Sequence, residues 1–173
     1  MLIVFTGNGK GKTTAALGQA LRLVGDGKKV LMVQFIKGPW HSGEEDSAKL
    51  LGPNFKIVKK GKGFVGIFGD KLPREEHKEA AREALAFVDK EIQSGKWEVV
   101  ILDEVNNAVA LGLIAEKDVE KVLHRAHKKV EHVILTGRNA APEFIEEADL
   151  VTEMREVKHP YVEGVMGVKG VEY

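Results

Sequence analysis

The sequence contains no cysteine and no long apolar run, and each absence excludes a class of function. Without cysteine there can be no disulfides, thiolate nucleophiles or cysteine metal sites. No apolar stretch approaches the roughly 18 residues of a membrane-spanning helix, so we expect no membrane partner. The first residues, "MLIVF", lack the basic segment of a signal peptide, so we expect a cytoplasmic protein.

An excess of charge of one sign is also lacking. Lys and Arg total 26, Asp and Glu total 26, and aromatic residues make up only 6% of the chain. Proteins that bind nucleic acid usually carry a basic surface, and those that bind single-stranded nucleic acid stack its bases on aromatic side chains. The balanced charge and the few aromatic residues therefore disfavour a nucleic-acid-dependent motor. The length of 173 residues, with 43% hydrophobic and 30% charged residues, predicts one globular domain over residues 1–173.

Short apolar runs alternate with amphipathic segments along the whole chain. We expect strands at 1–5, 30–35, 55–58, 97–104, 132–137 and 149–157, and helices at 13–25, 74–95, 116–130 and 142–148. Near-continuous apolar strands separated by helices indicate an α/β fold with a mostly parallel sheet covered by helices on both faces. Ligands of such sheets bind beyond the carboxyl ends of the strands.

The stretch "VFTGNGKGKTTAALG" predicts a phosphate-binding loop between the first strand and the first helix. Gly11, Lys12 and Thr13 match the end of the template G-x-x-x-x-G-K-[ST], but Thr6 stands where its first glycine should be. Gly7 and Gly9 suggest a variant loop in which backbone N–H groups still converge on an anion at a helix N-terminus. Lys12 would contact the phosphates and Thr13 would bind Mg²⁺.

The stretch "VVILDE" brings two carboxylates to the same edge of the sheet. Asp103 and Glu104 follow four apolar residues, which is the arrangement that holds Mg²⁺ beside a phosphate loop. An alternative is that Asp103 caps the turn that follows, with Glu104 taking the metal. Arg138, in "TGRN" after another strand, either reaches a phosphate or forms a surface salt bridge.

Other polar and aromatic residues have simpler explanations. His124, His127 and His132 could hold a metal, but a solvated helical face is the preferred interpretation because no further ligand stands at a fixed spacing. Lys59, Lys60 and Lys62 could contact phosphates, but a charged, solvated loop is the preferred interpretation. Trp40 and Trp97 are expected to be packing residues.

Five segments together give the chain a family resemblance. They are "TGNGKGKTTAALG", "VQFIKGPWHSGE", "VILDEVNNAVALGLI", "VILTGRNAAPEFIEEADLVTEMREVKH" and "GVKGVEY". In this order they resemble the P-loop type of corrinoid adenosyltransferase, which acts on cob(I)yrinic acid a,c-diamide and on cobalamin or cobinamide. The resemblance implies a RecA-like P-loop NTPase fold and a homodimer, and a flavoprotein is a candidate reductant.

The resemblance also implies a reaction. In the family, Co(I) of a reduced corrinoid attacks the ribose C5′ of ATP, and the whole triphosphate leaves. Such a site needs no general base, but it needs charge stabilisation by Lys12 and by Mg²⁺ on Thr13 and Glu104. By the same resemblance, Asn8, Lys10 and Thr14 contact the nucleotide, with Arg138 as a further candidate.

Two departures from the family pattern concern the cover of the site and the corrinoid contact. Many members carry an extra N-terminal segment that helps cover the site, and this chain begins one residue before its first strand, so we expect the cover to be missing or replaced. The family often has a "GFTW"-like stretch against the corrin, and here it is "GFVG". Phe64 matches, Gly66 replaces the tryptophan, and Phe68 is a candidate for filling the gap.

Two rival functions remain at the level of the sequence. One is a conventional P-loop ATPase or kinase, in which Glu104 activates water or a hydroxyl. The other is a binding module that takes up ATP or a corrinoid without catalysing a reaction. The products distinguish them, because adenosyl transfer releases triphosphate, hydrolysis releases ADP and phosphate, and a binding module releases neither.

Overall fold

The computed structural model describes residues 1–66, 70–160, 164 and 167–171. In this part of the chain six strands form one sheet in the order β3-β2-β4-β5-β1-β6, and every neighbouring pair is parallel. The strands are β1 Leu2–Thr6, β2 Val30–Gln34, β3 Phe55–Lys59, β4 Val99–Asp103, β5 His132–Thr136 and β6 Leu150–Glu153. The predicted α/β class and parallel sheet are thus confirmed.

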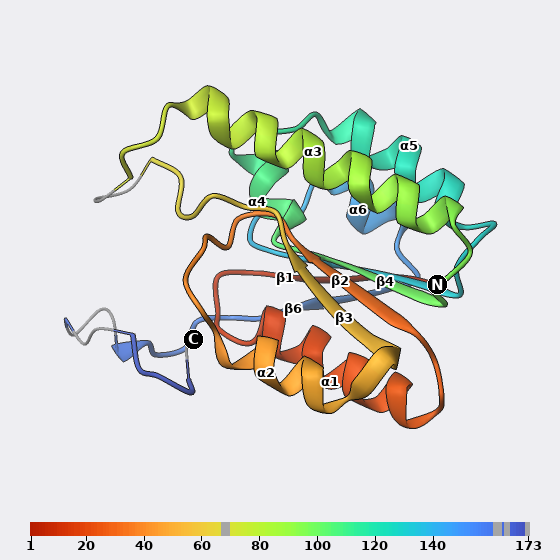
Figure 1. Ribbon diagram of the computed structural model, residues 1–173. Coiled ribbons are helices and arrows are strands. Elements are labelled where there is room, and N and C mark those ends of the chain that lie inside the picture. The colour runs from red at the N-terminus through yellow and green to blue at the C-terminus, as the bar shows by residue number, and fades with distance from the viewer. Residues whose placement is uncertain (67–69, 161–163, 165–166, 172–173) are drawn as a thin grey trace.

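Helices cover both faces of the sheet, as expected (Figure 1). On one face lie α1 Lys12–Gly25 and α2 Gly43–Leu50, which is followed by the 3₁₀ turn Gly52–Asn54. On the other face lie α3 Arg74–Gln93, α4 Val105–Ala110, α5 Glu116–Ala126 and α6 Pro142–Glu147. Each helix layer buries its apolar stripe against the sheet, so the core is divided into two clusters, one on each face.

The central strands are fully apolar until their last residues. Burial is complete along β2 and β4, because both of their faces are covered by helices. Polar side chains, Gln34 and Asp103, come only at the carboxyl ends of these strands. The sheet therefore places its polar groups along one edge, which is where the loops after β1, β2, β4 and β5 meet.

Several predicted boundaries were wrong. The helix predicted to reach residue 130 ends at Ala126, because the Ala126 carbonyl accepts from the N–H groups of Lys129 and Val130 and turns the chain into β5. The strand predicted over 149–157 ends at Glu153. After Met154 N donates to Thr6 O at 2.8 Å, the chain crosses the phosphate loop instead of continuing along β1.

Two helices, α2 and α4, were not predicted. A capping box marks the start of α2, where the side chains of Ser42 and Glu45 bond each other's backbone N–H groups. This signal is visible in the sequence as Ser-x-x-Glu. The short helix α4 falls where a turn was expected.

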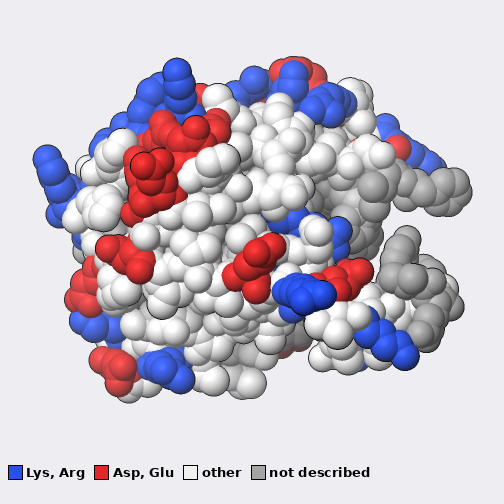
Figure 2. Space-filling view, turned by 180° about the vertical axis from the view of Figure 1, so that it is seen from behind, with Lys and Arg blue, Asp and Glu red and all other residues white. Residues whose placement is uncertain are grey.

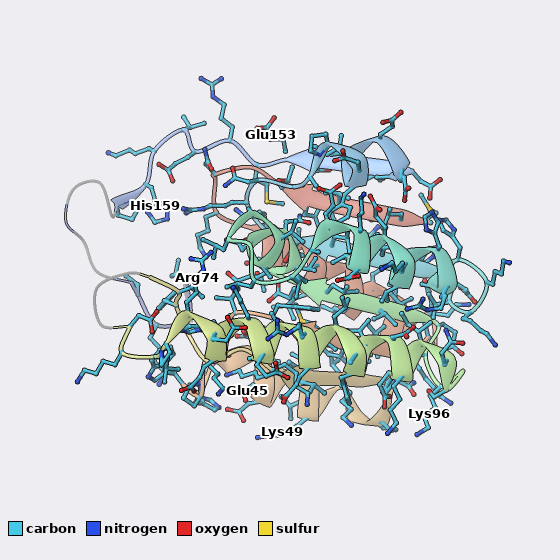
Figure 3. The ribbon with its side chains drawn as sticks, turned by 90° about the horizontal axis from the view of Figure 1, so that it is seen from above. Glu45, Lys49, Arg74, Lys96, Glu153 and His159 are labelled. Atoms are coloured by element: carbon cyan, nitrogen blue, oxygen red, sulfur yellow. The ribbon has the colours of Figure 1, made fainter. Side chains whose placement is uncertain are left out.

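Surface charge is mixed on the face shown in Figure 2, where basic and acidic side chains of the described residues are interspersed with uncharged ones. No helix in the described part of the chain is long and apolar enough to cross a membrane. In Figure 3, Arg74 and His159 lie toward the end at which the strands finish, and Lys96 lies at the opposite end.

Candidate active site

The predicted phosphate loop, residues 7–11, connects β1 to α1. The backbone is left-handed at Gly7 and at Gly11, with φ of 92° and 116°, which glycine adopts readily. Gly9 N donates to Met154 O at 2.7 Å, and a Cβ on Gly9 would lie 2.7 Å from the carbonyl carbon of Arg155. The segment after β6 therefore packs directly on the loop, and this contact requires a glycine quite apart from any phosphate.

Two cationic side chains come together at this loop. Lys12 Nζ donates to Gly9 O at 2.6 Å. Burial and the nearby guanidinium of Arg138 lower the pKa of the Lys12 ammonium, although Glu104 and Glu156 act in the opposite direction. The backbone N–H of Arg138 is fixed by Asn107 Oδ1 at 2.8 Å. Such a pair of cations beside a helix N-terminus can bind a phosphate group.

Three other residues predicted to contact the nucleotide also belong to this region. Asn8 and Lys10 are exposed on the loop, and Thr14 is exposed in the first turn of α1. Their side chains are thus accessible from the solvent side of the loop.

A buried carboxylate connects the phosphate loop to the centre of the sheet. Asp103 is completely buried and accepts hydrogen bonds from Thr13 Oγ1 at 2.8 Å, Thr136 Oγ1 at 2.6 Å and Gln34 Nε2 at 3.1 Å. Burial raises the pKa of Asp103, and these hydrogen bonds oppose the rise. The alternative that Asp103 caps the next turn is wrong, because the residue in the N-cap position of α4 is Glu104.

Glu104 adopts an unusual backbone conformation. Its φ of 62° and ψ of 20° are left-handed, which is rare for a residue other than glycine and is concentrated at functional sites. Its backbone N–H donates to Thr136 Oγ1 at 2.9 Å. Burial and the adjacent Asp103 carboxylate raise the pKa of Glu104 to about 7, while the charges of Lys37, Lys12 and Arg138 lower it.

The oxygen atoms at this point suit a hard cation. The two neighbouring carboxylates have raised pKa values, so their negative charge is not fully compensated by the protein. With the Thr13 hydroxyl they match the sparse protein ligands of Mg²⁺, which completes its shell with phosphates and water. Among the described residues no three His, Cys, Asp or Glu side chains gather as a metal site. His124 is exposed on α5, and His127 is exposed directly after it.

An ion pair holds the loop after β2 beside these carboxylates. Lys37 Nζ bonds Glu44 Oε1 at the start of α2, and Gln34 Nε2 lies 3.4 Å from the same oxygen. Burial alone would raise the pKa of Glu44, but the hydrogen bond and charge of Lys37 lower it to about 2. The carboxylate therefore stays ionised and anchors α2 next to the site.

The aromatic residues are distributed differently from the prediction. Trp97 packs against the core, as expected, and its Nε1 donates to Glu91 Oε2 at 2.7 Å. Trp40 was predicted to be a packing residue, which is wrong, because it is 62% exposed and stacks on Phe64. Gly66 has φ of 67° and open space around it, and Phe68 lies outside the described residues.

Lys59, at the end of β3, and Lys60 and Lys62, in the loop after it, form contacts within the protein. Lys59 bonds Glu45, Lys62 pairs with Glu76, and the Lys60 ammonium lies 4.9 Å from the centre of the Phe87 ring. The interpretation of these lysines as a charged loop agrees with these contacts.

Four residues of the site were missed in the sequence: Gln34, Lys37, Asn107 and Thr136. For Gln34 and Thr136 a signal exists, since each is a polar residue at the carboxyl end of an apolar strand. Nothing in the sequence indicated that Lys37 and Asn107 would turn toward the site.

The parallel sheet, the glycine-rich loop leading into α1 and the carboxylate at the end of β4 together define a protein with the RecA-like P-loop fold. A solved structure supports the fold. The flagellar accessory protein FlaH from Methanocaldococcus jannaschii superimposes with a TM-score of 0.56 over 88% of this chain and 69% of its own, at 12% identity.

Sequence comparison identifies the family within this class. The model of the family ATP:corrinoid adenosyltransferase BtuR/CobO/CobP matches residues 1–173. The corrinoid adenosyltransferase of Escherichia coli K12 is 40% identical over 100% of this chain and 85% of its own length. Corrinoid adenosyltransferase CobA of Salmonella typhimurium LT2 is 36% identical over the same shares. The chain therefore belongs to the ATP:corrinoid adenosyltransferase family, as the resemblance predicted, and is a transferase of this type.

Proposed function

We propose that this enzyme binds the triphosphate of ATP on the loop of residues 7–11 and transfers the 5′-deoxyadenosyl group to Co(I) of a reduced corrinoid. The observation that carries the proposal is the hydrogen bond between Thr13 Oγ1 and Asp103 Oδ1, at 2.8 Å. It joins the end of the phosphate loop to the carboxylates of β4, so that a phosphate, a cation and acidic oxygens can meet at one point.

The bonds and electrons of the step balance without a protein nucleophile. The Co(I) electron pair forms the Co–C5′ bond, the C5′–O bond breaks, and its electron pair leaves on the triphosphate. Cobalt becomes formally Co(III). No proton is transferred, so the protein needs neither a general base nor a general acid.

The role of the protein is to stabilise the leaving group. Lys12 releases the Gly9 carbonyl and places its ammonium on the triphosphate, and the guanidinium of Arg138 supports it from the loop after β5. The free N–H groups of the loop and of the first turn of α1 contribute further hydrogen bonds, with Asn8, Lys10 and Thr14 beside them. The backbone donors are held by the loop and the helix before the reaction, so they require little reorganisation.

Mg²⁺ is the cation that these oxygens would hold. Thr13 and Glu104 would coordinate it, with Asp103 either as a further ligand or as the acceptor that orients Thr13. The bound cation would offset the charge of the triphosphate. The left-handed backbone of Glu104 turns the chain out of β4 directly after Asp103, so the two carboxylates belong to neighbouring residues at the end of this strand.

The proposed binding site of the corrinoid lies at the loops after β2 and β3. Phe64, which is 62% exposed on that side, contacts the ring. Because the chain has no cysteine, no thiol of its own can reduce Co(II), and we propose a separate reductant, with a flavoprotein as the candidate. The cytoplasm, where ATP is made, is the proposed location.

A homodimer is the proposed assembly. The edge strand β6 exposes two apolar side chains, with Leu150 41% and Val151 39% accessible. An uncovered edge strand of this kind can pair with a second chain. The resemblance to the family supports the same assembly.

Magnesium dependence tests the proposed metal site. We expect Glu104→Ala to raise the Mg²⁺ concentration for half-maximal adenosyl transfer by roughly tenfold or more, because a carboxylate ligand is lost. The measurement follows the disappearance of the Co(I) spectrum anaerobically with ATP and chemically reduced cob(I)alamin. Glu83→Ala, on the exposed side of α3, is the control and should leave the titration unchanged. An unaltered titration for Glu104→Ala would remove Glu104 from the metal site.

A further inference from the structure

Two aromatic side chains from different loops stack on the surface of the protein. The rings of Trp40, after β2, and Phe64, after β3, have centroids 6.0 Å apart and planes inclined by 28°. Each residue is 62% exposed. The outer faces and edges of the two rings stay in contact with water, and exposed apolar surface of this kind commonly marks a binding site.

The indole of Trp40 is held in position although it is exposed. A Cβ on Gly38 would lie 2.7 Å from Trp40 Cζ3, and one on Gly63 would lie 2.9 Å from Trp40 Cη2, so both glycines leave room for the ring. Gly63 N is in turn bonded to Ile36 O at 2.9 Å. An indole fitted against two backbone segments has little freedom to lose when a ligand binds, which favours affinity.

A hydrogen bond fixes the backbone of the same residue. Lys59 Nζ, at the end of β3, donates to Trp40 O at 2.5 Å and also bonds Glu45 Oε1. Glu45 Oε1 accepts from Ser42 N at 2.8 Å. The loop after β2 is thus tied to both β3 and α2, and the aromatic pair has a fixed orientation relative to the sheet.

The pair lies at the same edge of the sheet as the proposed nucleotide site. Gln34, at the end of β2, contacts Asp103, and the loop with Trp40 begins directly after it. Three strand steps separate β2 from β1 in the sheet order, which is about 14 Å at the usual spacing. A ligand on the aromatic pair would therefore lie beside a nucleotide whose phosphates are on the loop after β1.

We propose that Trp40 is a corrinoid-binding residue that forms, with Phe64, the apolar aromatic pair against which the corrin ring packs. Gly66 has no side chain to contribute, whereas Trp40 brings a large ring from a separate loop. The inference rests on the proposed function in one respect, the placement of the corrinoid at the loops after β2 and β3. It goes further by assigning a binding role to a residue outside the "GFVG" stretch.

Equilibrium binding and single-turnover kinetics test the role of Trp40. Cob(II)alamin, which cannot displace triphosphate, is titrated calorimetrically, and cob(I)alamin transfer is followed over a range of ATP concentrations up to saturation. Trp40→Ala should weaken cob(II)alamin binding by roughly tenfold, because the aromatic ring against which the corrin packs is lost. The KM for ATP should stay within about twofold, and Trp40→Phe should retain most of the affinity. Trp97→Phe, at a partly buried tryptophan that precedes β4, is the matched control.

The outcomes separate this inference from the proposed function. If wild-type protein neither binds cob(II)alamin nor consumes cob(I)alamin, the proposed function fails. If wild type is active and Trp40→Ala binds cob(II)alamin normally, only the role of Trp40 is overturned. Equal loss of ATP and corrinoid affinity would make Trp40 a structural residue and would also overturn it. Trp40→Leu, which keeps an apolar side chain without a flat ring, gives the same test if alanine disturbs the loop.

Discussion

At the scale of the residue, the site depends on a few side chains whose partners come from distant parts of the chain. The oxygens of Asp103 receive three hydrogen bonds, from residues on α1, β2 and β5. Among these donors Thr136 has two roles, since its hydroxyl also accepts a hydrogen bond from the backbone N–H of Glu104. A single hydroxyl thus orients one carboxylate and fixes the backbone of the next.

Replacement of Lys12 is the sharpest test at this scale. We expect Lys12→Ala to lower the rate of adenosyl transfer by roughly 10²–10³, because a charged donor to the leaving triphosphate is lost from a water-poor site. Single-turnover kinetics with prereduced cob(I)alamin measure the step directly. Lys96→Ala, which removes a lysine at the opposite end of the molecule, should be unaffected (Figure 3). Near-normal turnover by Lys12→Ala would contradict the proposed role of the loop.

Sequence reasoning succeeded with residues that belong to a pattern and failed with isolated ones. The meeting of Thr13 with Asp103 could be predicted, because a phosphate loop and an acidic strand end occupy the same edge of a parallel sheet. Trp40 was misassigned because a lone tryptophan in a loop carries no signal of its exposure. Lys37 was missed because its partner, Glu44, lies on α2, a helix that was not predicted.

At the scale of the element, the phosphate loop and the segment after β6 form one packed unit. Gly7 and Gly9 approach the backbone of Met154 and Arg155 so closely that any side chain on them would collide with it. The strand predicted over 149–157 was too long for this reason, since the chain leaves the sheet in order to cross the loop. No local sequence pattern could show that two segments about 150 residues apart share this contact.

A pair of glycine substitutions tests this packing. We expect Gly9→Ala to lower the free energy of unfolding by about 1–3 kcal/mol, because its methyl group would overlap the backbone of Arg155. Gly18→Ala is the matched control on α1, where a Cβ meets nothing within 4 Å. It should raise the free energy of unfolding by about 0.5–1 kcal/mol, because alanine favours helix. Denaturant unfolding measures both. Equal stability of Gly9→Ala and wild type would show that the contact is not tight.

At the scale of the whole molecule, the sheet separates two kinds of surface along one edge. Cationic and acidic groups gather at the ends of β1, β4 and β5, and stacked aromatic rings lie at the loops after β2 and β3. The fold class followed from the alternation of apolar strands and helices, which depends on many residues and tolerates errors in single boundaries. The order of the strands required the structure, because the apolar pattern does not specify which strands are neighbours.

The central claim, that the triphosphate leaves as one unit when the adenosyl group is transferred, is tested most directly by product analysis. Purified protein is mixed anaerobically with ATP, Mg²⁺ and chemically reduced cob(I)alamin, and the phosphorus products are measured by ³¹P NMR while the Co–C bond is followed by absorbance. We expect one triphosphate for each Co–C bond formed. Release of ADP and phosphate with the Co(I) spectrum unchanged would contradict the account.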